Sequence, residues 1–430
     1  MEKLTTEEIE KKINGWGDSD IYNRLEMYKS YYLAENPSLE KKVKDRQYRG
    51  KTPNNFVPTA YYTSVIDSMA GYMFNHVQYK TGPAYTELLN KTLKSNKQAI
   101  KDMKAGIQAL AYNRAVELVY TNKDAEPVFS NIDPLSLIPV YDEEIEHNLF
   151  CGIWRRKSSN GDLVDVIYSD EWQYYTVEKG KLVLRDKPKK LFFSECPIVI
   201  YDTQIIGSKP PFHQIIPYID VLDWLITGNS NEIERLVDAL LVLGKSVSKE
   251  DLAHMDEWKA LSNYKTEDRA EYLTKDMTPS FREYVSKLLI QEIHKHSHVI
   301  DWYNPDTGIS GTASGKALKT RLFDMDMYSQ RIEKIFREGT EKRINLIADI
   351  FKIKGKPIEP VEIEFKRDMI NDFEEKILAL NQAAFISVRT KIEESGLVWE
   401  EEEKRLDKEK KKEMESIPTM GDLYEIQATE

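Results

Sequence analysis

TASGKALKTRLFDMDMYSQRIEKIFREGTEKRINLIADIFKIK, residues Thr312 to Lys354, is the stretch that decides the fold. Its apolar side chains recur at steps of three and four residues, the repeat that lines one side of an α-helix. Ser314 is suited to cap the start, and Gly355 followed by Pro357 ends the pattern. The sequence predicts one helix of roughly 60 Å, with a bend at Gly339–Thr340, where the apolar stripe is interrupted.

The glycines before this helix do not form a nucleotide-binding loop. That loop needs a glycine, four further residues and then Gly-Lys-Ser/Thr, so that backbone N–H groups surround the phosphates. Here Gly315-Lys316 is followed by Ala317, and Ser310 stands where the first glycine is required. A helix of this length instead indicates a beam in an assembly, from which the rest of the chain extends.

Composition excludes several classes of protein. The chain has 430 residues, 61 basic and 72 acidic, and a net charge of −11. A protein that binds DNA on its own normally carries a net positive field, because its affinity comes largely from neutralising phosphates. Cys151 and Cys196 are the only cysteines, which fits a reducing compartment and argues against a disulfide scaffold. No apolar run approaches 18 residues, so we expect no membrane span.

Residues 1–210 are predicted to form an α+β domain. Amphipathic helices are expected at Asp20–Leu33, Ala60–Phe74 and Lys91–Arg114. The basic segment Lys41–Lys51 between them is interpreted as a solvated linker, with a nucleic-acid contact as the alternative. From Ala115 the period changes to two, which is typical of strands. The expected strands are Val116–Tyr120, Pro127–Phe129, Ser136–Tyr141, Phe150–Arg155, Asp165–Tyr168, Glu171–Val177 and Pro197–Tyr201.

After Pro210-Pro211 the pattern indicates a helix, an insert and a second helix. The helices are predicted at Ile215–Leu243 and Pro279–His298. His294 and His298 lie four residues apart, as zinc-binding pairs do. No third ligand is evident, and histidines also suit the last turn of a helix because they interact favourably with its dipole. We therefore predict no metal there.

The C-terminal part is predicted to contain one strand and several helices. Val361–Phe365 alternates and is expected to join the earlier sheet. Helices are expected at Asn371–Ala384, Ser387–Glu394 and Trp399–Met414. Asp301 and Asp306 share a loop that could bind Mg²⁺, although Asp-Gly loops are far more often turns. No other catalytic motif is present, so the sequence predicts a protein that is not an enzyme and needs no cofactor.

The order of these elements resembles the portal, or head–tail connector, proteins of tailed bacteriophages, in particular those of siphophages that infect Gram-positive hosts. The resemblance covers nearly the whole chain, and the order of its short motifs is more specific than any single one. The motifs are Asn54–Pro58, Val65–Asp67, Gly71–Phe74, Ile132–Pro134, Tyr141-Asp142, Cys196–Val199, Thr312–Lys319 and Asn371–Glu402.

The resemblance implies an α+β, mostly α-helical portal fold with the following domains. Residues 1–212 would form the wing, 213–243 the first stem helix, 244–278 a small clip, 279–299 the second stem helix, 300–312 a tunnel loop, 313–372 the long wing helix and a strand, 373–417 crown helices, and 418–430 a flexible tail. A ring of twelve copies is implied, located at one vertex of the virion capsid and assembled in the host cytoplasm.

The resemblance also implies functional residues and partners. The tunnel loop facing DNA would be Trp302, Tyr303, Asn304, Pro305, Asp306, Thr307, Gly308, Ile309, Ser310 and Gly311. The hinge into the long helix would be Ser314, Gly315 and Lys316. The clip contacts would be Lys249, His254, Trp258, Tyr264 and Lys265. The partners would be double-stranded DNA, the terminase large subunit, the major capsid or scaffold protein and a head-completion adaptor, with no membrane.

Two other classes of function stay open on the sequence alone. A metal-dependent nuclease or other DNA-processing enzyme would use Asp301, Asp306 and the histidines. A helical scaffold of the capsid interior without a pore would need none of these residues. Cleavage of plasmid DNA that is lost with Asp301→Ala would favour the enzyme, whereas a ring seen in purified protein would favour the portal.

Overall fold

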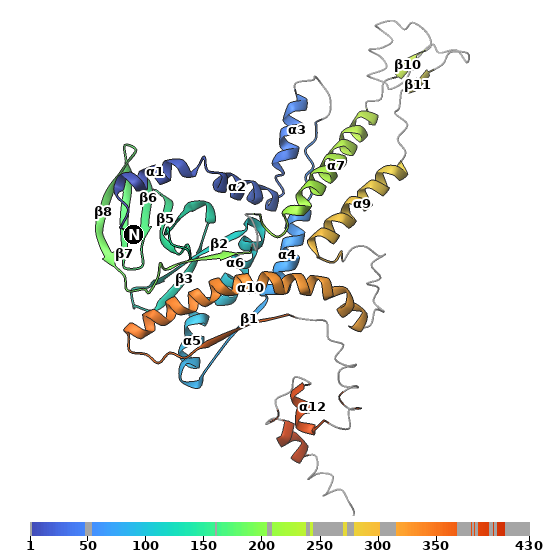
Figure 1. Cartoon of the computed structure of the whole chain (residues 1–430). Helices are drawn as coiled ribbons and strands as arrows, with labels where there is room; N and C mark the ends of the chain where they lie inside the picture. Colours follow the sequence, from blue (N-terminus) through green and yellow to red (C-terminus); the bar gives the residue numbers. More distant parts are fainter. Residues whose placement is uncertain are drawn as a thin grey trace, which may run out of the picture. The chain divides into compact units, whose positions relative to one another are not determined.

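The computed structural model describes residues 2–47, 54–159, 161–203, 209–237, 241–243, 270–272, 279–301, 315–367, 380, 382, 386–394, 399 and 402–408. The chain divides into two compact units. The first comprises Met1–Asp301 and Asp324–Asp368, and the second comprises Trp302–Phe323 and Met369–Glu430. Figure 1 shows helices and strands together in the first unit, which confirms a mixed fold of α and β elements.

The first unit begins with two helices, the first of which packs against a five-stranded antiparallel sheet (Figure 1). Helices α1 (Thr6–Trp16) and α2 (Asp20–Tyr32) are capped by Thr5 and Ser19, whose hydroxyls accept backbone N–H groups of the first turn. The sheet has the order β4-β5-β6-β7-β8. Its strands are β4 (Leu137–Tyr141), β5 (Leu149–Ser158), β6 (Gly161–Ile167), β7 (Glu171–Glu178) and β8 (Lys181–Lys190).

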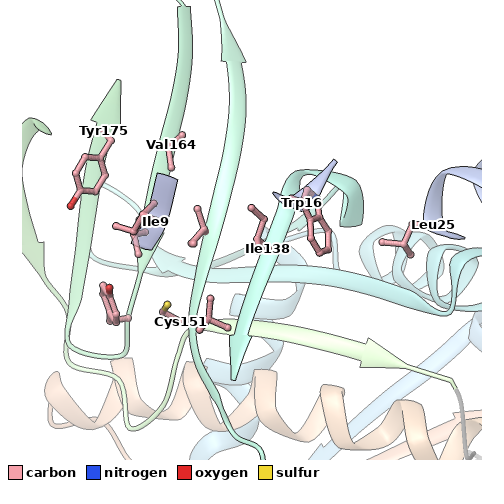
Figure 2. Packing of buried hydrophobic residues seen from close by; sticks show 11 residues of the cluster. Ile9, Trp16, Leu25, Ile138, Cys151, Val164 and Tyr175 are labelled. Atoms are coloured by element: carbon pink, nitrogen blue, oxygen red, sulfur yellow. The ribbon is translucent and has the colours of Figure 1, made fainter. Parts of the chain in front are cut away.

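The core of this layer forms because alternate strand residues face the helices. Figure 2 shows Ile9 and Trp16 of α1 and Leu25 of α2 among side chains from the sheet. Cys151 and Val164 come from neighbouring strands, and all these side chains are buried. Burial raises the pKa of the Cys151 thiol to about 12. A thiol so protonated and enclosed acts as a small apolar side chain.

A second antiparallel sheet lies between the first sheet and the helices of the body. It consists of β2 (Arg114–Thr121), β3 (Pro127–Ile132) and β9 (Ile198–Asp202), with β2 in the centre. A buried cluster joins it to Leu137 and Ile167 of the larger sheet, and its members from this sheet and its flank are Val116, Leu118, Ile132, Cys196 and Ile198. The short 3-10 turn η1 (Pro134–Ser136) joins the two sheets.

The helical part of the body is built around α4 (Tyr61–Phe74), α6 (Gln98–Tyr112) and α10 (Gly315–Ile353). Phe74 of α4 and Phe336 of α10 have ring centroids 4.6 Å apart. Gly106 of α6 faces the Phe74 ring so closely that a Cβ there would lie 2.1 Å from it. Because Gly106 has no side chain, the Phe74 ring of α4 packs directly on the backbone of α6.

The long helix α10 confirms the helix predicted from Thr312–Lys354, and the bend at Gly339–Thr340 stays a prediction. It runs as one α-helix through Gly339 and Thr340. Gly339 allows a close contact, since a Cβ at this position would lie 2.6 Å from the ring of Tyr201. Tyr201 in turn stacks on Phe336, with centroids 4.6 Å apart. The absence of a side chain at Gly339 therefore allows the ring of Tyr201 to pack directly on the backbone of α10.

Other predictions of local structure were wrong. Lys41–Gln47, taken as a linker, belongs to helix α3 (Pro37–Gln47), because Leu39 and Val43 supply a buried apolar side. Lys91–Arg114 was predicted to be one helix, but it covers the end of α5 (Pro83–Ser95) and all of α6. The two helices are separated where Lys97 adopts φ 52°. Strand β8 was missed because its side chains are exposed on both faces and show no alternation.

The strand near the C-terminal end of this unit pairs differently from the prediction. β12 (Val361–Lys366) was expected to join the earlier sheet. It pairs instead with β1 (His76–Thr81) in a separate antiparallel sheet, with Val77 opposite Phe365. The alternation of β12 indicated a strand but carried no information about its partner, and β1 was itself missed.

Two helices complete the first unit. The 3-10 turn η2 (His213–Ile215) leads into α7 (Ile216–Val237), and α9 is Pro279–Ser297. The prediction of a helix to Leu243 was wrong at its end, because Leu241–Leu243 forms β10 and pairs with β11 (Ala270–Tyr272). The rest of the predicted insert lies outside the described residues. Among the described residues, none of the helices is long and apolar enough to cross a membrane.

The second unit contains the first turns of α10 and a small helical segment. α12 (Val388–Glu394) begins after Ser387, whose hydroxyl accepts the backbone N–H of Thr390 at 3.2 Å. Residues 402–408 are also helical, as predicted within Trp399–Met414. The predicted helix Asn371–Ala384 lies almost wholly outside the described residues.

Candidate functional site: a helix pair and the segments that hold it

Helices α7 and α9 lie side by side and run in opposite directions (Figure 1). Arg282, near the start of α9, pairs with Glu232, near the end of α7. At the other end of the pair, the rings of Tyr218 and His296 stack with centroids 5.2 Å apart. Ile293 is fully buried in the seam. The two predicted stem helices therefore form an antiparallel hairpin.

One side of α7 carries a row of buried polar residues. Asp223, Thr227 and Asn231 follow one another at steps of four, so they share one face of the helix. A buried polar group is costly unless it is hydrogen-bonded. Partners for all three are therefore expected nearby, and the extended segment 54–59 supplies them.

The segment 54–59 runs along this row and bonds to each residue in turn. The backbone N–H of Thr59 donates to Asp223 at 2.9 Å and that of Val57 to Thr227 at 3.2 Å. The N–H of Asn55 donates to Asn231 at 2.7 Å. Two residues of extended chain span about 6.6 Å, and four residues of helix span about 6.0 Å. The two repeats match closely, so a strand can bond to a helix at three successive positions.

Asp223 is the centre of this arrangement. The Thr59 hydroxyl donates at 2.6 Å to the same carboxylate oxygen as the Thr59 N–H, and the other oxygen accepts from the side chain of Asn36 at 2.6 Å. Burial raises the pKa of Asp223, and the hydrogen bonds from Thr59 and Asn36 act against that rise. Through Asp223, α7 is fixed both to segment 54–59 and to the turn before α3.

The opposite faces of the pair carry uncovered apolar side chains. On α9, Phe281, Tyr284 and Leu288 are 66%, 64% and 42% exposed, at steps of three and four residues. Val221 and Ile233 on α7 are also exposed. The side of α9 that packs on α7 carries Arg282 and Ile293, which lie on a different face from Phe281. An apolar row of this kind marks a surface where another protein binds.

The histidines at the end of α9 each have their own partner. His294 contacts the carbonyl of Val299 at 3.0 Å through Nδ1. His296 lies 3.1 Å from Glu292, and His298 lies 2.9 Å from Asp324. His298 follows the helix with φ 57° and does not continue the face of His294. Among the described residues there is no group of three His, Cys, Asp or Glu side chains arranged to hold a metal ion.

Helix α10 is fixed to the body by a buried arginine. Arg343 lies 2.6 Å from Asp102 of α6 and 3.3 Å from Glu117 of β2, and it donates to the hydroxyl of Tyr79. Tyr201 of β9 donates to Glu117 at 3.3 Å. Burial raises the pKa of Glu117, and the Arg343 guanidinium opposes that rise. Arg343 thus bonds the long helix directly to three other elements, and β9 joins the cluster through Glu117.

Most of the predicted site residues cannot be placed. The tunnel loop Trp302–Gly311, the hinge residue Ser314 and the clip residues Lys249, His254, Trp258, Tyr264 and Lys265 lie outside the described residues. Gly315 and Lys316 are the first residues of α10. The buried polar row of α7 was missed, although Asp223, Thr227 and Asn231 at steps of four in an apolar helix are a signal that the sequence contains.

Comparisons with known proteins give one family. The sequence profile of the family described as "Phage portal protein, SPP1 Gp6-like" matches residues 14–416. A search of curated proteins found no match.

Several solved structures are similar to this chain at low identity. The neck of a native gene transfer agent particle computed with C12 symmetry is 10% identical, with 86% of this chain and 92% of that chain covered and a TM-score of 0.45. The virion of the native gene transfer agent particle is 11% identical, with 89% and 95% covered and a TM-score of 0.47. The neck of an empty particle computed with C6 symmetry is 12% identical, with 79% and 89% covered and a TM-score of 0.45. At these scores the similarities carry no argument about function.

Proposed function

The chain belongs to the family of SPP1 Gp6-like phage portal proteins, and from this premise we propose that its copies form a closed ring, of twelve subunits, at one vertex of a phage capsid. The ring is a conduit for double-stranded DNA. DNA enters through it during packaging by an ATP-driven terminase and leaves through it during ejection. The ring later serves as the docking site for the head-completion adaptor.

The uncovered apolar row of α9 is the observation that carries this proposal. Phe281, Tyr284 and Leu288 are exposed in the single chain, although α9 is already packed on α7 along another face. A contact between two different faces of identical subunits is head-to-tail, and it closes into a ring when the rotation between copies is right. In the ring, this row of one copy packs on the exposed apolar side chains of α7 in the next copy, such as Ile233.

The parts of the chain have distinct roles in the ring. Residues 1–212 with α10 form the wing, and α7 with α9 forms the wall of the channel. Residues 244–278 are the clip, which binds first terminase and then the adaptor, and residues 300–312 are the tunnel loop beside the DNA. Residues 373–417 are the crown. The net charge of −11 per copy limits tight binding of the moving duplex.

Neither alternative function is supported by the family match, and the geometry gives no reason to prefer one. A nuclease would need ligands that converge on a metal, whereas His294, His296 and His298 are each bound to a separate partner. The portal role is that of a passive conduit, with the energy for DNA movement supplied by terminase.

The proposal is tested by placing charge in the apolar row. Phe281→Asp combined with Leu288→Asp removes two side chains whose burial is worth about 1.5 to 3 kcal/mol each and adds two carboxylates to the same contact. We expect the ring seen by mass photometry to shift to single chains, and DNA packaging measured by protection from nuclease to be lost.

The matched control lies on the same helix. Glu283→Ala combined with Lys287→Ala removes an exposed ion pair beside the apolar row, and such pairs contribute little. This control should keep the ring and the packaging activity. If the double aspartate variant assembled as well as the control, the apolar row would not be the subunit contact and the proposed wall of the channel would be wrong.

A further inference from the structure

The loop between β4 and β5 exposes one apolar side chain among acidic ones. Ile145 is 98% exposed, and Glu143, Glu144 and Glu146 surround it in the sequence. The loop nevertheless has a defined shape. Asp142 donates its backbone N–H to the Asn148 carbonyl at 2.9 Å, and its side chain accepts the N–H groups of Glu144 and Asn148. A fixed loop that holds an isoleucine in water is suited to insert it into a partner.

A groove on the same unit has features that complement this loop. It has a volume of about 910 Å³ and lies between α1–α2 and the strands β5–β8. Its apolar lining includes Ile13, Leu33 and Val177. The exposed fractions of Leu33 and Val177 are high for such side chains, so the groove offers apolar surface that an inserted isoleucine could cover.

The charges of the groove divide between its two walls. The strand wall carries Arg155, Lys157 and Lys181, which form no ion pair within the described part of the chain. The helix wall carries Glu26 and Glu35. An acidic segment is therefore attracted to the strand side of the groove and repelled from the helix side.

Most of the remaining charged groups of the lining have partners within the chain. Lys29 pairs with Asp133 at 3.1 Å, and Arg156 pairs with Asp165. Glu10 accepts the backbone N–H of Leu182 at 2.7 Å. Asp162 is the one acidic side chain on the strand wall. Three cations against one carboxylate leave this wall with a local positive excess in a chain whose net charge is −11.

The loop and the groove cannot meet within one copy. β5 begins at Leu149, directly after the loop, and reaches the groove wall at Arg155. Six residues of strand separate these positions by about 20 Å. The two surfaces therefore lie toward opposite ends of one strand, and a contact between them joins different faces of two copies, which is a head-to-tail contact.

We propose that the Asp142–Asn148 loop of one copy inserts Ile145 into this groove of the next copy. Glu143, Glu144 and Glu146 then face Arg155, Lys157 and Lys181 of that copy. This contact rests on the proposed ring, to which it adds a second set of subunit contacts made by the wing in addition to those made by α7 and α9. It also sets the direction of the ring, because only one orientation of the neighbour presents the groove to the loop.

The contact is tested by photo-crosslinking from the loop. p-Benzoylphenylalanine replaces Ile145 in the full-length protein, and crosslinked peptides from assembled rings are identified by mass spectrometry. We expect crosslinks to peptides that contain residues 155–157 or 177–182, in bands of twice the chain mass. The same photoreactive residue at Asp124, in the exposed turn between β2 and β3, should give no crosslink to these peptides.

Each outcome of the crosslinking decides something different. Rings whose crosslinks from position 145 map elsewhere, or that give none, overturn this contact and leave the proposed function intact. A protein that stays a single chain at all concentrations overturns the ring and this contact together. Crosslinks within the groove support the contact whatever the outcome of the α9 substitutions.

A charge exchange tests the electrostatic part. Reversing Arg155, Lys157 and Lys181 to Glu should raise the concentration needed for half-assembly about tenfold, as should reversing Glu143, Glu144 and Glu146 to Lys. Combining the two sets should restore assembly. The control reverses Lys187, Lys189 and Lys190, which lie on the same exposed strand β8 but outside the groove. Equal losses in control and groove variants, or no recovery in the combined variant, would contradict the pairing.

Discussion

The cluster around Arg343 and the α7–α9 pair both bury polar groups that form hydrogen bonds within the chain. The two regions differ in how much apolar surface they leave exposed. Around Arg343, one guanidinium, two carboxylates and two tyrosine hydroxyls come from five elements of the same chain and form a buried cluster. Along α7, Asp223, Thr227 and the side-chain oxygen of Asn231 also accept hydrogen bonds from within the chain. The other faces of the helix pair, however, remain apolar and exposed at Phe281 and Tyr284.

The contacts that bury Arg343 all come from the same chain, whereas the contacts that would cover the exposed apolar rows must come from a neighbouring copy. A closed cluster fixes the position of α10 in each copy before assembly. The helix pair is fixed along one side only, and the exposed rows gain their burial when copies meet. The wing is therefore expected to be stable alone, whereas the channel wall becomes complete only in the ring.

The largest expected effect comes from breaking the closed cluster. Arg343→Ala leaves Asp102 and Glu117 buried without their cation, so the free energy of unfolding should fall by about 4 kcal/mol. Urea denaturation of the purified protein measures the loss. Lys354→Ala, which removes a partly exposed pair with Glu126, serves as the control and should cost less than about 1 kcal/mol. Similar losses in both variants would show that the cluster does not hold α10.

A smaller effect is expected from the attachment of the helix pair. Asp223→Ala removes the acceptor of Thr59 and Asn36 and should lower the free energy of unfolding by about 2 to 3 kcal/mol. Because the loss is local, amide hydrogen exchange should speed up in α7 and segment 54–59 and stay unchanged in α10. Glu234→Ala, at the exposed end of the row, should change little. Equal acceleration in α7 and α10 would contradict a separate attachment.

The smallest effect concerns the charge on Glu117. Burial raises its pKa in the folded protein above the ordinary value of 4.5, so between these two values the folded state binds more protons than the unfolded state. Stability due to this group is present at low pH and falls as the pH rises through that window. The unfolding free energy of the natural protein relative to Glu117→Gln should therefore decrease, by up to about 1.4 kcal/mol per pH unit.

This slope is measured by urea denaturation at a series of pH values above 4.5. Glu126→Gln, at an exposed carboxylate, provides a baseline that should show no comparable slope against the natural protein. A difference between the natural protein and Glu117→Gln that stays flat or increases with pH would show that the cluster keeps Glu117 ionised at no cost.

The sequence was most informative where a local period and a local stop signal coincide. Predicted as Thr312–Lys354, α10 is Gly315–Ile353, and α9 was predicted to within one residue of its end. The apolar period reports which side of a helix is buried, and Gly355 and Pro357 report where the helix ends. Neither signal depends on the rest of the fold.

Features that depend on distant residues were not predictable in this way. The partner of β12 is β1, nearly 300 residues earlier, and no local pattern encodes that pairing. The contact between Gly339 and Tyr201 was not predictable because Tyr201 is remote in sequence. The row at Asp223 became meaningful only when segment 54–59 was seen beside it. The resemblance of motif order supplied the family, which local patterns alone did not.

Imaging the purified natural protein by electron microscopy tests the central claim most directly. The account predicts class averages of a closed ring with an open centre, in which the apolar row of α9 meets α7 of the neighbouring copy. Particles without a central hole, or a ring in which Phe281, Tyr284 and Leu288 face solvent, would contradict it.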